Sequence, residues 1–282
     1  DGYDFGTYMH AGYWLNHTVH NPYPEKVELV MKEMFQKYEA DKYCLVNGQN
    51  FRPFLLNLVA YSEVCNNPDT FNADAFYKEW TEQYFTPKAA EHAVQSMKWL
   101  SEAQEGRKGY VEHLWEIREA VSYLSNAPIV RPGKSPVPFD YNRVIGDVEN
   151  VKRVKEVLEK SLSEAELGYE LLKRNDNFYH SYILLPAQLY SDLITFETEL
   201  HNMALLKKQF ETTKDIKYLN EAISLLSTAK NKLKIVFDHR SSGDIDDKWK
   251  KWYSIANRRQ NNGFPTYEML DAIEANLNKM TL

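Results

Sequence analysis

The sequence predicts a mainly α-helical protein, with a partial (β/α) barrel segment of one βαβ unit followed by an all-α helical bundle. Two short runs rich in aromatic and aliphatic residues, at 5–14 and 42–47, are typical of β-strands. Between them, residues 25–40 carry apolar side chains at steps of three and four, which predicts an amphipathic helix. The segments after Pro53 have helical patterns. These observations define the predicted fold class.

The predicted strand–helix–strand unit has a clear helix start. Pro24 precedes the helix, and Glu25 and Glu28 lie in its first turn, where negative charge suits the helix dipole. Strands joined by a crossover helix run parallel, and we expect these two to be neighbours in one sheet. A sheet of only two strands leaves both edges open. We therefore expect this unit to be the last part of a larger α/β domain.

Helix signals recur through the rest of the chain. Asn72 is a predicted N-cap, Thr86 precedes a proline at a first helical position, and Pro186 is expected to kink a long helix. Helices are predicted at 54–65, from 73, from 87, through 114–124, at 144–174, 178–210 and 216–237, and after Thr266.

Four regions follow from this pattern. They are the end of a barrel-like domain (1–85), connecting helices (86–125), a linker with four prolines (126–142) and a helical-bundle domain (143–282).

The composition excludes some classes of partner. The net charge is −6, and there is no basic stripe of the kind that binds nucleic acid. No apolar run is long enough to span a bilayer. Cys44 and Cys65 form no CxxC pair, and we expect both thiols to be buried as small apolar groups. Aromatic residues make up 13% of the chain, which suits both sugar stacking and helix–helix cores.

Several segments, taken in order, resemble glycoside hydrolase family 115, the xylan α-glucuronidases. The segment "YMH" at 8–10 is similar to the family's "YYH", and "ADKYCLVNGQNFRP" at 40–53 is similar to a family strand and loop. Further similar segments are "NNPDTFNADAFYKEWTEQYF" at 66–85, "YILLPAQL" at 182–189 and "DDKW" at 246–249. The resemblance covers most of the chain, and it is based on the order in which these segments occur.

This resemblance implies a barrel followed by a helical bundle, and inverting removal of glucuronic acid from xylan side chains. It implies that His10, Asn47, Tyr8 and Arg52 bind substrate. An imidazole and an amide are suitable hydrogen-bond partners for sugar hydroxyls and a carboxylate. No cofactor is expected.

The sequence also departs from the family pattern. Asn50 stands where the family has Asp, Leu55 stands where it has Glu, and Arg52 replaces a Lys with its charge kept. An inverting glycosidase needs two carboxyl groups roughly 6.5–9.5 Å apart. In the family these come from earlier barrel strands, so we assign no catalytic residue here. The chain is expected to hydrolyse glycans only together with an upstream barrel.

Individual residues have alternative interpretations. His10 and Asn47 could be an ordinary strand-end histidine and turn asparagine. His10, His17 and His20 offer enough nitrogen ligands for a metal, but the segment is loop-like and no carboxylate ligand is placed by spacing. No metal ligand is therefore assigned. Glu63 is expected to be a surface charge rather than a catalytic acid.

The expected function is that of the C-terminal portion of an α-glucuronidase-related protein that acts on or binds plant glycan side chains. The alternative is a non-catalytic helical domain that binds protein or glycan, with its aromatic residues forming an exposed patch. A homologue that binds sugar without cutting it also fits the departures. Expected partners are an acidic plant glycan, the upstream barrel of the same protein and a second copy through the open strand edges, with no nucleic acid or membrane. The expected location is the periplasm or the extracellular space.

Overall fold

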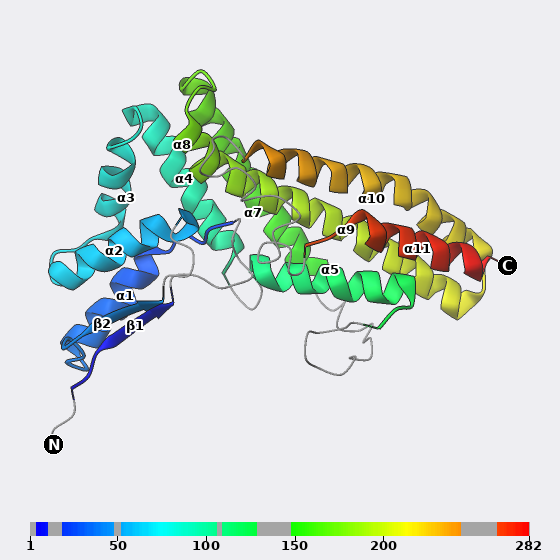
Figure 1. Cartoon of the computed structure of the whole chain (residues 1–282), viewed down its shortest axis with the longest axis horizontal. Helices are drawn as coiled ribbons and strands as arrows, with labels where there is room; N and C mark the ends of the chain where they lie inside the picture. Colours follow the sequence, from blue (N-terminus) through cyan, green and yellow to red (C-terminus); the bar gives the residue numbers. More distant parts are fainter. Residues whose placement is uncertain are drawn as a thin grey trace. The chain divides into compact units, whose positions relative to one another are not determined.

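A computed structural model describes residues 4–10, 19–47, 52–105, 109–128, 148–243 and 264–281. It confirms a mainly α fold with one small βαβ unit (Figure 1). Within these ranges no helix combines the length and apolarity needed to cross a membrane. The elements are β1 (Thr7–His10), α1 (Pro24–Gln36), β2 (Cys44–Asn47), the 3-10 helix η1 (Arg52–Phe54), α2 (Leu55–Asn66), α3 (Ala73–Glu82), α4 (Pro87–Ala103), α5 (Tyr110–Ser125), α7 (Val148–Leu171), α8 (Asn177–Tyr179), the π-helical segment η2 (His180–Leu184), α9 (Leu185–Thr213), α10 (Ile216–Ser242) and α11 (Tyr267–Met280).

The chain divides into two compact units. Unit 1 consists of Asp1–Gln104 and Val157–Ala187, and unit 2 consists of Glu105–Glu156 and Gln188–Leu282. Helices α7 and α9 each contribute residues to both units. The four regions predicted from the sequence stay predictions.

The predicted pairing of the two strands is confirmed. β1 and β2 are parallel neighbours, with Tyr8 opposite Leu45 and His10 opposite Asn47. Thr7 and Met9 are buried, whereas Tyr8 and Leu45 are 61% and 54% exposed. One face of the sheet is therefore left uncovered by the part of the chain that the structure describes.

Helices α1 to α4 contribute to the core of unit 1. α1 packs against α2, and α3 packs against α4. The predicted N-cap is confirmed, since the Ala75 backbone N–H donates to Asn72 Oδ1 over 2.9 Å. Pro87 begins α4 as predicted, although the Thr86 side chain forms no capping hydrogen bond. The aromatic side chains of the core meet around Trp80, Phe85 and Phe178.

The helix predicted at 178–210 is interrupted at its start. The π-helical segment η2 lies directly before Leu185 and Pro186, which begin α9. A proline lacks the N–H of a helical bond, and its ring clashes with the carbonyl group one turn earlier. A π-helical turn shifts that bonding pattern and is a common irregularity within helices. The sequence predicted a kink at Pro186, and the structure has a π-helical segment in the five residues His180–Leu184 that come shortly before this proline.

Unit 2 is built from helices. α11 packs against α5 and α10, and its apolar face buries Leu270, Ile273 and Leu277. The amide nitrogen Nδ2 of Asn276 donates to the carbonyl oxygen of Leu124 over 2.7 Å. This bond satisfies a carbonyl in the last turn of α5, where helical acceptors lack partners within the helix.

The expectation of two buried thiols is wrong. Cys44 is exposed because β2 lies at an open edge of the sheet, and Cys65 of α2 is half-buried. Their Sγ atoms lie 3.3 Å apart. Burial, followed by the contact with Cys44, raises the pKa of the Cys65 thiol to about 12. The two thiols therefore form a contact pair near the surface.

Candidate functional site

The ends of the two strands bring two of the predicted site residues together. The strand register places His10 opposite Asn47 at the carboxyl ends of β1 and β2. Asn47 is half-buried. The side chains of His10 and Arg52 lie outside the described residues, as does the whole of Asn50.

Tyr8 lines an open pocket of about 360 Å³ within unit 1, which we call the Tyr8 pocket. The walls come from β1, the start of α1 and α2. Besides Tyr8, the lining includes Asn21, Tyr23, Lys26 and Tyr61. The structure thus adds four residues that sequence reasoning did not select.

Hydrogen bonds from α2 and β1 fix the walls of this pocket. The buried Asn57 of α2 accepts a hydrogen bond from the Tyr23 backbone N–H over 3.0 Å. Its amide nitrogen donates to the Asn21 carbonyl oxygen over 2.6 Å. The hydroxyl groups of Tyr61 and Thr7 are hydrogen-bonded over 2.6 Å. Helix α2 is therefore hydrogen-bonded both to the segment before α1 and to β1.

The hydroxyl groups of Tyr23 and Tyr61 stay neutral at ordinary pH. Burial raises the pKa of Tyr23 to about 12, and burial likewise raises the pKa of Tyr61 to about 12. A neutral phenol can donate a hydrogen bond as well as accept one. These side chains thus offer aromatic faces and hydroxyl groups to a ligand.

Two further groups give the pocket its polar character. Lys26 contributes an ammonium group from the first turn of α1. Asn21 Oδ1 is buried and accepts no hydrogen bond from the residues that the structure describes. Ligands of βα units bind at the carboxyl ends of the strands, close to the start of the following helix. The position of Lys26 at the start of α1 is the sequence signal that could have identified it.

No carboxylate from the described ranges lines the Tyr8 pocket. Glu63 is exposed, as expected, and lines a separate open pocket of about 380 Å³ beside α3. Asp69 is also exposed and accepts a hydrogen bond from Gln36 over 3.2 Å. The described part of the site can therefore bind a ligand, but it holds no acid–base pair for hydrolysis.

The structure shows how His20, one of the three histidines considered as metal ligands, packs within unit 1. It is buried, and its ring packs edge-on against Tyr182 with 4.6 Å between ring centroids. The His20 carbonyl oxygen accepts a hydrogen bond from Gln104 over 2.9 Å. His17 and the His10 side chain lie outside the described residues. His20 is thus part of the core of unit 1.

The environment of His20 predicts a pH dependence of stability. Burial lowers the pKa of His20 from 6.5 to about 3, against a smaller opposing effect of a hydrogen bond with the Pro53 backbone. Between these values the unfolded chain binds a proton that the folded chain does not, so stability present above pH 6.5 is lost as the pH falls. We expect the titration of His20 to lower the free energy of unfolding by about 3 kcal/mol between pH 7 and pH 4.

Urea denaturation at pH 7 and pH 4 measures this cost. The variant His20→Gln keeps a polar side chain without the titration, so its free energy of unfolding should fall less than that of the wild type. Equal falls in the two proteins would contradict the prediction.

Comparisons with known proteins add no further assignment. No family model matches this chain, and no curated protein or solved structure matches it either. The function proposed below therefore rests on the geometry of the Tyr8 pocket and on the resemblance of the sequence segments.

Proposed function

We propose that this chain is the C-terminal portion of a carbohydrate-active protein related to xylan α-glucuronidases, and that the Tyr8 pocket binds an acidic plant glycan side chain. One observation carries the proposal. The pocket combines three tyrosines, a lysine and an asparagine beside β1 and the start of α1.

The chemistry of these groups matches a uronic acid. Tyrosine faces pack against the apolar face of a sugar ring, and their hydroxyl groups bind its polar rim. The ammonium group of Lys26 pairs with the sugar carboxylate as a compact charge. Asn21 Oδ1 accepts a hydrogen bond from a sugar hydroxyl. His10 and Asn47, which the strand register places opposite each other at the carboxyl ends of β1 and β2, are the other proposed substrate-binding residues.

The uncovered sheet face supports a larger barrel in the same protein. Tyr8 and Leu45 expose apolar surface on a sheet with two open edges. Strands of an upstream barrel portion would pair with these open edges and would supply the two carboxyl groups of an inverting hydrolase. A second copy of the chain is the other proposed partner. By itself, the chain binds the glycan without cutting it, and its proposed location is the periplasm or the extracellular space.

Exposed aromatic residues in β1 and just before the two strands favour the alternative of a non-catalytic binding domain. Phe5, Tyr8 and Tyr43 expose about half or more of their surface. An exposed aromatic patch of this kind is typical of an interaction surface. Under this alternative the glycan or protein partner binds across the sheet without any upstream barrel.

Calorimetric titration with two ligands tests the proposal. We expect a xylo-oligosaccharide that carries glucuronic acid to bind more tightly than the same oligosaccharide without it. Loss of a hydrogen bond to a charged group weakens binding by roughly 10- to 100-fold, so Lys26→Ala should remove the preference for the acidic ligand. Tyr8→Ala should weaken the binding of both ligands.

Lys37→Ala and Tyr38→Ala are matched controls. Both residues are exposed and lie beyond the far end of α1 from the pocket. These variants should bind like the wild type. Equal affinity for the acidic and the neutral oligosaccharide, or an effect of the controls as large as that of Lys26→Ala, would contradict the proposal.

A further inference from the structure

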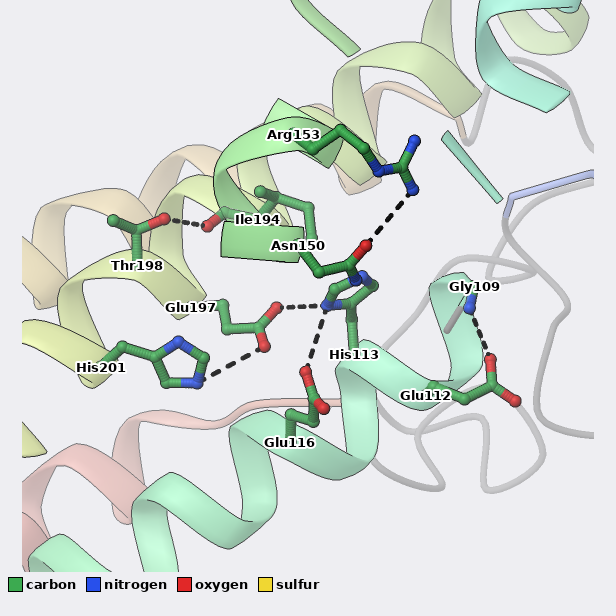
Figure 2. A network of polar contacts seen from close by, with 10 residues as sticks. All are labelled: Gly109, Glu112, His113, Glu116, Asn150, Arg153, Ile194, Glu197, Thr198 and His201. Carbon is green, nitrogen blue, oxygen red and sulfur yellow. Dashed lines mark hydrogen bonds and ion pairs between the residues drawn. The ribbon is translucent and has the colours of Figure 1, made fainter. Parts of the chain in front are cut away.

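Four side chains with metal-binding chemistry converge in the core of unit 2. His113 and Glu116 come from α5, and Glu197 and His201 come from α9 (Figure 2). Their spacings of three and four residues place each pair on one face of its helix. His113 and Glu197 are 0% exposed, His201 is 3% exposed and Glu116 is 7% exposed. We call these four residues the His–Glu cluster.

The ligand atoms of the His–Glu cluster face one another closely. His113 Nδ1 lies 2.8 Å from Glu197 Oε2 and 3.5 Å from Glu116 Oε2. Ligand atoms of these three residues all lie within 4.8 Å of one another. On the other side of Glu197, His201 Nε2 lies 3.6 Å from Oε1 (Figure 2). Glu197 is therefore the central carboxylate.

The separations of 2.8 and 3.5 Å from His113 Nδ1 to the two glutamates are close to the edges of a metal coordination polyhedron. With metal–ligand bonds of about 2.0–2.2 Å, two ligand atoms of one ion lie about 3.0–3.5 Å apart. A cation between the carboxylates of Glu116 and Glu197 also removes the repulsion between two like charges held close together. Small side-chain movements would suffice to admit an ion.

We propose that the His–Glu cluster binds one divalent transition-metal ion, with His113, Glu116 and Glu197 as ligands and His201 beside the second carboxylate oxygen of Glu197. Imidazole nitrogen with carboxylate oxygen is a donor set suited to Zn²⁺ and its first-row neighbours. The ion joins α5 to α9 and stabilises the bundle of unit 2. This site is independent of the glycan proposal, because it uses no residue of the Tyr8 pocket.

The sequence contained signals for this site. "HLWE" at 113–116 and "ETELH" at 197–201 each pair a histidine with a glutamate on one helical turn. Residues 117–196, 80 in all, separate the two segments along the chain. Only the folded structure shows that they meet.

Metal analysis of the whole purified chain tests the proposal. After removal of metal with a chelator, we expect one Zn²⁺ per chain to be retained on reloading, with a higher Tm that chelator reverses. Glu116→Gln and Glu197→Gln should each lose most of the retained Zn²⁺. The control His92→Asn removes a half-buried histidine that lies 2.7 Å from Glu164 in unit 1, and it should retain Zn²⁺.

Co²⁺ loading of the wild-type chain gives a test that needs no variant. Bound Co²⁺ should show the visible absorption of a four- or five-coordinate ion with nitrogen and oxygen ligands. Lack of both Zn²⁺ retention and this absorption would overturn the proposal, and the cluster would then be a buried ion-pair network. Equal loss of Zn²⁺ in the control and in the folded cluster variants would overturn it as well.

Discussion

Tyr182→Ala is expected to lower the free energy of unfolding by about 4 kcal/mol, the range of a large-to-small change at a fully packed aromatic position. Tyr182 lies in η2 and is buried. Its ring packs against Phe178 and Trp80, with centroids 5.3 and 5.5 Å away. The alanine variant would leave a cavity where these aromatic rings meet. Urea denaturation monitored by tryptophan fluorescence measures the loss.

The hydroxyl group of Tyr182 has a separate and smaller effect. It accepts a hydrogen bond over 2.9 Å from the backbone N–H of Leu56, in the first turn of α2. The N–H groups of a first turn have no partner within the helix. Tyr182→Phe leaves this buried donor unsatisfied and should cost about 1–3 kcal/mol. An equal loss in both variants, or a loss below about 1 kcal/mol for Tyr182→Ala, would contradict this account of the core.

Gly168→Ala is expected to destabilise the protein by about 3 kcal/mol, the upper part of the range for overpacking. At an unobstructed position within a helix the same change would stabilise by up to about 1 kcal/mol. In α7, however, an added Cβ atom would lie 1.9 Å from the Tyr179 hydroxyl oxygen and 2.6 Å from the Tyr179 Cζ. Tyr179 is buried between Tyr169 and Phe85, so its ring has little room to move.

A double-mutant cycle with Tyr179→Phe measures this clash. The Tyr179 hydroxyl is buried and forms no hydrogen bond with the described part of the chain. Tyr179→Phe alone should therefore be neutral or stabilise by up to about 1 kcal/mol. Together with Gly168→Ala it removes the nearest clashing atom and should recover part of the lost stability. Strict additivity of the two changes would show that the hydroxyl is not the obstacle.

Local signals in the sequence predicted much of the fold. The apolar period and Pro24 identified α1, Asn72 identified the start of α3, and Pro87 identified the start of α4. These signals act within one or two helical turns, so they can be read without tertiary contacts. The parallel pairing of β1 and β2 followed from the crossover helix between them.

The sites depend on contacts between distant segments and were predicted only in part. Tyr8 was selected, but its pocket is completed by Asn21, Lys26 and Tyr61. Tyr61 reaches the pocket only because α2 packs against α1. The thiol of Cys44 was expected to be buried, but the sheet ends at β2 among the described residues. Such outcomes depend on tertiary packing, which sequence periodicity does not specify.

Amide hydrogen exchange gives the most direct test of the claim that an acidic sugar binds in the Tyr8 pocket beside β1 and the start of α1. Exchange is followed peptide by peptide, with and without a saturating xylo-oligosaccharide that carries glucuronic acid. We predict slower exchange in β1 and at residues 19–27, with unit 2 unchanged. Protection confined to unit 2, or no protection in any peptide, would contradict the claim.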